Sequence, residues 1–102
     1  MAVVELCGEV DIYTAGEFRE IVCGLIDGGL TCIIIDTLQV AFMDSTALGV
    51  CASAERRLRP DGSLIIVCGE HTGRLFELTG LDRVLSLCKT RDEAWEAASR
   101  IS

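Results

Sequence analysis

Hydrophobic and polar residues follow two alternating patterns along the chain of 102 residues. Short runs of apolar, often β-branched residues occupy positions 3–10, 31–35, 63–68 and 84–88, and such runs are typical of buried strands. Between these runs, apolar residues recur at intervals of three and four, the spacing of one face of a helix. The pattern predicts helices over 14–27, 45–58, 72–78 and 90–101.

The first predicted helix shows its signals clearly. Residues 14–17 match a capping box, in which the hydroxyl of Thr14 and the carboxylate of Glu17 would bind free backbone N–H groups. Two glycines at 28 and 29 would end the helix. A loop through Gln39 is expected between the second strand and the second helix, and Thr90 begins a second capping box. The apolar face of the first helix is formed by Phe18, Ile21, Val22, Leu25 and Ile26.

Strands and helices therefore alternate in the order βαβαβαβα with short connections. This order predicts one α/β domain over residues 1–102, with a mostly parallel sheet of four or five strands and about four covering helices. In open α/β sheets, ligands and partners bind outside the carboxyl ends of the strands. Residues 9–11 and 43–45 each leave a strand toward a helix, so we expect them at the same end of the sheet.

Charge is distributed unevenly. Residues 1–50 contain eight acidic residues and one basic residue, whereas residues 51–102 contain eight of each, and the net charge is −7. An acidic chain without a basic stripe argues against nucleic acid and anionic membranes as partners. There is no apolar run near the ~20 residues of a membrane span and no secretory signal, so we expect a cytoplasmic protein.

Six cysteines are the other unusual feature of the composition. Their spacing contains no C-x-x-C pair, and the single histidine, His71, leaves little to complete a zinc site. Most of them lie within apolar runs, which favours buried free thiols. A redox sensor is the alternative, and it would require an exposed thiol of low pKa, for which Cys7 and Cys88 are candidates.

Catalytic signals are weak. The sequence contains no nucleophile elbow, no glycine-rich phosphate loop and no H-E-x-x-H motif. A Ser/His/Asp arrangement would have to use His71, and acidic pairs such as Glu9 and Asp11 are common in an acidic chain. We therefore expect a protein that is not an enzyme and that holds no metal or cofactor.

The segment 42–49 is more informative. Asp44 and Ser45 are both good N-caps, so the simplest interpretation is a capped helix start. Gly49, however, costs a helix ~1 kcal/mol relative to alanine, which suggests that something approaches the backbone there, unless the helix packs closely on the sheet. A phosphate on Ser45 would face free N–H groups and the positive end of the helix dipole. Ser45 is therefore a candidate phosphorylation site.

Three segments resemble the STAS-domain family, in particular bacterial anti-sigma factor antagonists. Residues 44–49 (DSTALG) resemble the family's loop signature, in which glycine usually stands at the position of Ala47. Residues 6–11 (LCGEVD), with Thr14 and Ala15, resemble its early strand and first helix. Residues 74–81 (RLFELTGL) resemble its late helix. The resemblance covers nearly the whole chain and implies the STAS fold.

The resemblance also implies a function. In the family, an anti-sigma factor that is an ATP-dependent kinase phosphorylates the serine that corresponds to Ser45, and Thr46 is the second candidate. The unphosphorylated protein would bind the anti-sigma factor and free a sigma factor, and a metal-dependent serine/threonine phosphatase would reverse the modification. The nucleotide belongs to the partner. The implied contact residues are Asp11, Asp44, Ser45, Thr46, Ala47 and Gly49.

Two departures and three alternatives accompany this interpretation. The family's usual first strand precedes the strand at 3–10 and is missing or truncated here, which would leave that strand with an unpaired edge and favour a monomer or weak homodimer. Ala47 in place of glycine could alter the approach of a partner.

Three alternative functions stay open. They are a STAS scaffold of a signalling or transport complex without phosphorylation, the cysteine-based redox sensor, and a small-molecule or nucleotide binder. The sequence argues against the last, because it has no basic residues for a phosphate near Asp11 and Asp44.

Overall fold

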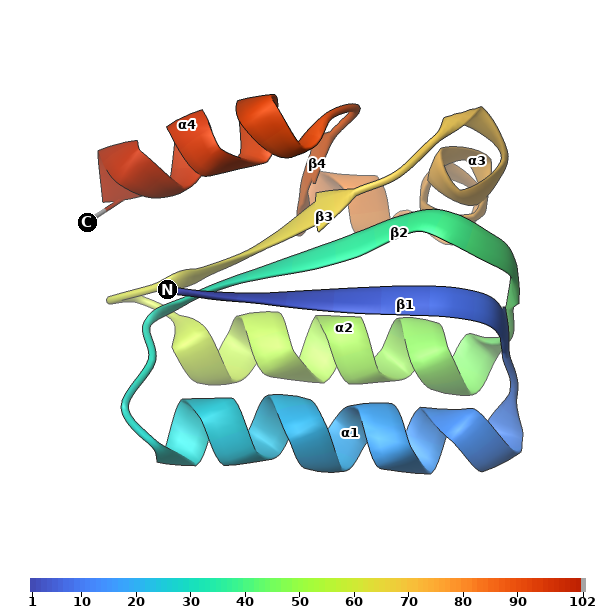
Figure 1. The fold of residues 1–102 in the computed structure, drawn as a ribbon, viewed down its shortest axis with the longest axis horizontal. Coiled ribbons are helices and arrows are strands. Elements are labelled where there is room, and N and C mark those ends of the chain that lie inside the picture. The colour runs from blue at the N-terminus through green and yellow to red at the C-terminus, as the bar shows by residue number, and fades with distance from the viewer. Residues whose placement is uncertain (102) are drawn as a thin grey trace.

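The computed structural model describes the backbone of residues 1–101 and the side chains of residues 1–100. Strands and helices alternate through this part of the chain, as the sequence pattern predicts (Figure 1). A short 3-10 helix, η1 (Leu81–Arg83), precedes the last strand. The elements are β1 (Ala2–Val10), α1 (Ile12–Asp27), β2 (Cys32–Met43), α2 (Ser45–Leu58), β3 (Ser63–Val67), α3 (Glu70–Leu78), β4 (Ser86–Cys88) and α4 (Arg91–Ile101).

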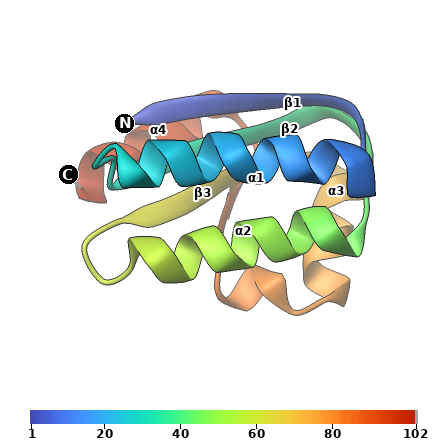
Figure 2. The ribbon, with the colours of Figure 1, turned by 90° about the horizontal axis from the view of Figure 1, so that it is seen from below.

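The four strands form one parallel sheet in the order β1-β2-β3-β4. Helices α1 and α2 lie side by side on one face, and α4 lies on the opposite face (Figures 1 and 2). The predicted α/β class, the parallel sheet and the four helices are confirmed. No helix within residues 1–101 is long and apolar enough to cross a membrane.

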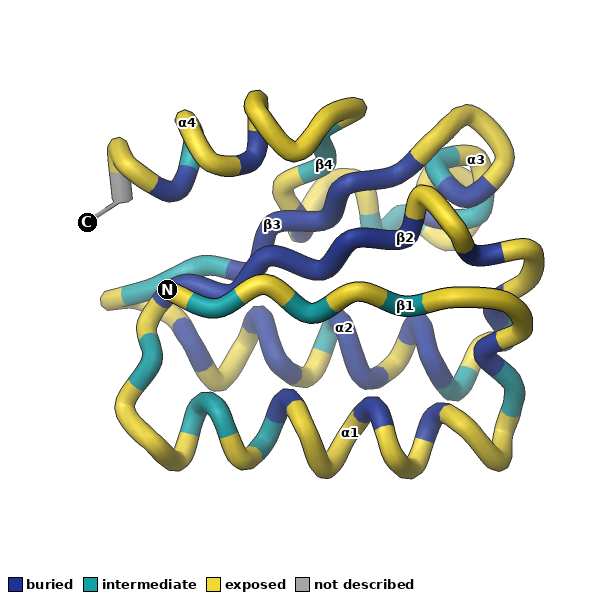
Figure 3. The backbone as a smooth tube through the Cα atoms, in the orientation of Figure 1, coloured by how far each residue is buried: buried dark blue, intermediate teal, exposed yellow. Residues whose placement is uncertain are grey.

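The core lies on both faces of β2 and β3, which are the most deeply buried strands (Figure 3). Side chains of successive strand residues point to opposite faces. Ile33 and Ile35 accordingly belong to the large cluster beneath α1, α2 and α3, whereas Ile34 packs with Ala94 and Ala98 of α4. Because both central strands are buried on both faces, their sequences are continuous apolar runs rather than alternating ones.

The start of α1 differs from the prediction. Helix α1 begins at Ile12, and its N-cap is Asp11 rather than Thr14. The Asp11 side chain accepts hydrogen bonds from the backbone N–H groups of Tyr13 and Thr14, and the Thr14 hydroxyl accepts one from the Asp11 N–H at 2.9 Å. Thr14 thus takes the reciprocal position of a capping box that starts three residues earlier. Aspartate caps a helix at least as well as threonine, which the prediction overlooked.

The expected loop through Gln39 is also wrong, because β2 continues to Met43. Two register shifts in the β1–β2 pair, between Glu5 and Cys7 and between Gly8 and Glu9, accommodate the extra residues of β2. Gly8 adopts a positive φ of 71°, which glycine does at no steric cost. Such bulges interrupt the regular pattern of the strand, and this hid the strand in the sequence.

The apolar face of α1 is only partly covered. Phe18 and Val22 are buried, and Leu25 and Ile26 pack against the core, but Ile21 remains 47% exposed. Ile21 thus lies on the predicted apolar face of α1 but outside the core. β1 is an edge strand that pairs with β2 alone within the described residues.

Candidate functional site

The ends of β1 and β2 place two acidic helix caps side by side. Val10 and Met43 are register partners in the parallel sheet, so the residues that follow them, Asp11 and Asp44, begin the adjacent helices α1 and α2. The backbone N–H of Asp44 donates to the carbonyl of Val10 at 3.1 Å, which ties the two helix starts together. The predicted convergence of residues 9–11 and 43–45 at one end of the sheet is confirmed.

Asp11 is fixed by the backbone around it. Its Oδ1 accepts from the N–H groups of Tyr13 and Thr14 at 3.0 and 3.1 Å. These bonds, first of all that from Thr14, lower the pKa of the Asp11 carboxyl below its ordinary value. The carboxylate is therefore ionised at neutral pH and adds a negative charge beside the start of α2.

Asp44 caps α2 in the same way, so Ser45 is the first residue of this helix. Its Oδ1 accepts from the Ala47 N–H at 3.1 Å, and its carbonyl accepts from the Leu48 N–H at 3.2 Å. Ser45 is the first residue of α2 and is exposed, whereas Thr46 is half-buried. Of the two candidate hydroxyl groups, that of Ser45 is thus the more accessible to another protein.

Gly49 and Ala47 have opposite surroundings. A Cβ atom added at Gly49 would meet no other atom within 4 Å, so close packing on the sheet does not require glycine there. Gly49 lies four residues after Ser45, which places it on the same side of the helix one turn further. Ala47 is fully buried and therefore lies outside any surface that a partner could touch. Gly49 is exposed and open to a partner beside Ser45.

Three exposed apolar side chains neighbour these caps in the chain. Ile12 and Tyr13, in the first turn of α1, are 64% and 87% exposed, and Phe42, just before the end of β2, is 49% exposed. Sequence analysis did not assign these residues to the site. The available signal was their position within two residues of Asp11 or Asp44, and for Ile12 and Tyr13 also their position outside the apolar stripe of α1. Exposed aromatic side chains of this kind are frequent anchors in protein interfaces.

The cysteines do not form a comparable site. Cys32, Cys51 and Cys68 are buried, as predicted for packing thiols. Burial raises the pKa of the half-buried Cys88 thiol, and Glu93 raises it further, whereas a redox sensor needs a lowered value. Within residues 1–101 no group of three His, Cys, Asp or Glu side chains could hold a metal ion.

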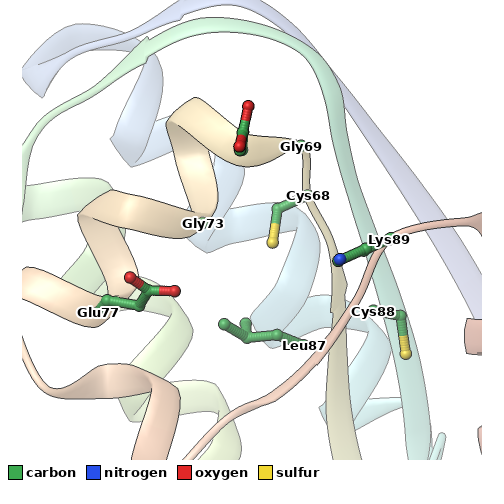
Figure 4. A pocket seen from close by; sticks show the side chains of 8 residues that line it. Cys68, Gly69, Gly73, Glu77, Leu87, Cys88 and Lys89 are labelled. Atoms are coloured by element: carbon green, nitrogen blue, oxygen red, sulfur yellow. The ribbon is translucent and has the colours of Figure 1, made fainter.

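A groove lies elsewhere, between α3 and β4 beside the end of β3 (Figure 4). It has a volume of about 450 Å³, and Cys68, Leu87 and Lys89 are among its lining residues. Cys68 and Cys88 both line it, yet they belong to opposite faces of the sheet. His71, an exposed residue of α3, is not among its lining residues.

Comparison with known proteins gives a consistent result. Residues 1–94 match the sequence model of the STAS domain family. The anti-sigma-B factor antagonist of Staphylococcus aureus is 34% identical over 80 residues, which are 76% of this chain and 74% of that protein. An anti-sigma factor antagonist from Mycobacterium paratuberculosis has a crystal structure with a TM-score of 0.89 and 30% identity, covering 95% of this chain and 84% of that one.

A further similar structure is that of the Bacillus cell fate determinant SpoIIAA in its phosphorylated form. Its TM-score is 0.71 at 26% identity, and the match covers 93% of this chain and 87% of that one.

Proposed function

This chain belongs to the STAS domain family, and we propose that it is an anti-sigma factor antagonist that is switched by phosphorylation of Ser45. In the unphosphorylated state it binds an anti-sigma factor and thereby releases a sigma factor. The chain acts by binding the anti-sigma factor, and its partners catalyse the transfer and the removal of the phosphate. The names of its relatives in Staphylococcus and Mycobacterium support the antagonist function.

One observation supports the position of the switch. Ser45 is exposed at the first position of α2, between an acidic cap and the open backbone at Gly49. We call the surface formed by Asp11, Asp44, Ser45, Thr46 and Gly49, with the exposed apolar Ile12, Tyr13 and Phe42, the Ser45 face. This face combines apolar anchors with fixed negative charge, and it fits a partner surface with apolar pockets and basic residues.

The modification itself needs a kinase and ATP supplied by the partner. The Ser45 Oγ would attack the γ-phosphorus of ATP, the bond from that phosphorus to the β–γ bridging oxygen would break, and ADP would leave. The hydroxyl proton would pass to a base of the kinase. The phosphorylated form of the relative SpoIIAA supports this proposal, because it shows that a protein of this fold is modified by phosphorylation.

The phosphate would disfavour the complex through electrostatics. It adds about −1.5 to −2 charges at pH 7, directly beside Asp44 and next to the cap at Asp11. A partner that packs against the neutral Ser45 hydroxyl would exclude the water that solvates these charges, and burying a charged group that the partner surface is not built to pair costs several kcal/mol. Because about 1.4 kcal/mol corresponds to tenfold in affinity, a hundredfold switch requires no change of fold.

The remaining partners follow from the same proposal. A metal-dependent serine/threonine phosphatase would remove the phosphate from the exposed Ser45, and the cycle would take place in the cytoplasm, where sigma factors act. The switch needs no cofactor on this chain.

The test is co-purification of the chain with a candidate anti-sigma factor kinase, with and without ATP. Wild type should bind without ATP and dissociate with it, while its mass increases by one phosphate at Ser45. The Ser45→Ala variant should stay bound in both conditions, and Ser45→Asp should bind poorly. If wild type and Ser45→Ala respond alike to ATP, the switch is refuted. Phosphate located at Thr46 instead would move the site to the neighbouring hydroxyl.

A further inference from the structure

The groove between α3 and β4 lies at the carboxyl ends of two parallel strands. It is lined by the residue that follows β3, by residues of α3, and by the last residues of β4 with the one after them. Ligands of open α/β sheets bind at this end of the strands. The volume of about 450 Å³ is within the range of small-molecule sites. We call this site the α3–β4 groove.

The floor of the α3–β4 groove is apolar. Leu87 and Cys68 point into it, whereas the side chain of Cys88 turns away (Figure 4). Burial raises the pKa of the Cys68 thiol, and the neighbouring Cys88 and Glu77 raise it further. The Cys68 thiol is therefore protonated at neutral pH and packs like a small apolar group.

Charged side chains stand on two sides of this floor. Glu77 of α3 and Lys89, which follows β4, point toward the groove from opposite sides (Figure 4). Glu70, the first residue of α3, is the third charged residue that lines it. None of these three side chains forms an ion pair with a described residue. The groove thus offers an unpaired ammonium group and unpaired carboxylates around an apolar floor.

These charges determine which ligand fits. A simple anion would pair with Lys89 but would be repelled by two carboxylates, and a simple cation would be repelled by Lys89. A molecule that carries both an ammonium and a carboxylate group can form charge-assisted hydrogen bonds on both sides. An apolar substituent on the same molecule would cover Leu87 and Cys68.

Gly73 keeps the groove open on the side of α3. It lies in the middle of this helix, where glycine is less favourable than alanine. An added Cβ atom would lie 3.5 Å from the Cys68 Sγ, which is an ordinary contact, so the packing of the helix does not require glycine. A methyl group at this position would occupy space beside Cys68 in the groove. Space for a ligand therefore explains the glycine.

We propose that the α3–β4 groove binds a free α-amino acid with an apolar side chain. The ammonium group of the amino acid would bind Glu77, its carboxylate would bind Lys89, and its side chain would pack on Leu87 and Cys68. This inference goes beyond the proposed switch and does not depend on the phosphorylation of Ser45.

Nuclear magnetic resonance titration of the isotope-labelled full chain tests the proposal. The probes are L-leucine, L-methionine and L-phenylalanine, and at least one should give saturable shifts of the amides of residues 68–73 and 87–89. Each is compared with its analogues that lack the ammonium or the carboxylate group, which for leucine are isocaproate and isoamylamine. Both analogues should bind at least tenfold more weakly than the amino acid. Equal binding of either analogue, or no saturable shift with any of the three amino acids, would overturn the proposal.

Variants of the chain locate the binding site. Lys89→Gln and Glu77→Gln remove exposed charges and should each weaken binding at least tenfold. The matched controls are Arg83→Gln and Glu20→Gln, which remove exposed charges outside the groove and should change binding less than twofold. An equal effect of variants and controls would place the ligand elsewhere and refute the assignment. Ser45→Asp should bind the amino acid like wild type, which separates this site from the Ser45 face.

Gly73→Ala tests the shape of the groove. It should raise Tm, because alanine favours the helix, and should weaken binding of the amino acid at least tenfold. Gly24→Ala, at an exposed position of α1 with open space for a Cβ atom, should raise Tm and leave binding unchanged. If Gly73→Ala binds the amino acid as tightly as Gly24→Ala does, the ligand does not occupy the space beside Cys68 and the proposal is wrong.

Discussion

Replacing Gly49 by alanine should make the protein more stable. Gly49 lies within α2 and is exposed, and an added Cβ atom would meet nothing within 4 Å. The change therefore yields the full difference in helix propensity, about 1 kcal/mol, without a clash. For a domain of about 100 residues, 1 kcal/mol corresponds to a rise of about 4 °C in Tm.

The same change should weaken the proposed complex. Gly49 is one helical turn from Ser45, so the new methyl group would stand on the surface that the anti-sigma factor approaches. Forcing a methyl group into a closely packed contact costs about 1–3 kcal/mol, which corresponds to a loss of affinity of about 5- to 150-fold. Calorimetric titration with the anti-sigma factor and urea unfolding of the free protein measure the two effects separately.

Gly24 provides a matched control. It lies in α1, is exposed, and also has open space where a Cβ atom would be added, but it is near the opposite end of the helix from Asp11. Gly24→Ala should therefore give the same gain in stability and leave the affinity unchanged. If Gly49→Ala binds the anti-sigma factor as tightly as Gly24→Ala does, then the partner does not use the space at Gly49, and our reason for the glycine is wrong.

Three further predictions concern single side chains. Glu55 is buried and accepts a hydrogen bond from the Leu64 N–H at 2.7 Å. Glu55→Ala leaves that buried N–H without an acceptor and should lower the free energy of unfolding, measured in urea, by about 2–4 kcal/mol. A loss below about 1 kcal/mol would show that the hydrogen bond from Leu64 does not stabilise the fold. The pKa of Asp11 is lowered in the folded protein, so the ionised Asp11 carboxylate stabilises the fold above the ordinary carboxyl pKa, and this stabilisation is lost as the pH falls through the lowered value. The difference in unfolding midpoint between wild type and Asp11→Asn should therefore shrink on acidification. A difference that stays constant with pH would refute this role of Asp11. Burial raises the pKa of the Cys51 thiol to about 12, so iodoacetamide should modify the exposed Cys7 of the native protein and leave Cys51 unmodified, as peptide mapping would show. Early labelling of Cys51 would contradict this and would show that the core opens.

The order of elements and the central strands could be predicted because their signals are local. Ile33 to Ile35 and Leu64 to Val67 are continuous apolar runs, which only a strand buried on both faces requires. The second half of β2 could not be predicted, because two register shifts break its pattern. The exposure of Ile21 could not be predicted either, since it depends on where the sheet ends rather than on α1 itself.

The candidate site was predictable in its polar part only. Asp44 and Ser45 were identified because caps have a sequence signature, and Asp11 because parallel strands bring their ends together. Ala47 was assigned to the same surface by resemblance, but helix geometry directs its methyl group into the core. Tyr13 was missed because an exposed aromatic residue has no periodic signal, and its position beside a cap becomes informative only when both helix starts are seen together.

The uneven charge of the chain gathers near the Ser45 face. The net charge of −7 in residues 1–50 is distributed over β1, α1, β2 and the start of α2, and Asp11 and Asp44 cap the two helices that begin at this face. A phosphate on Ser45 would add to this charge, and a partner packed against the neutral hydroxyl would have to strip water from it. Because screening at physiological salt has a length of about 8 Å, the added charge acts mainly on groups close to Ser45. The modification should therefore change the binding of a partner that contacts Ser45 and leave surfaces further away unaffected.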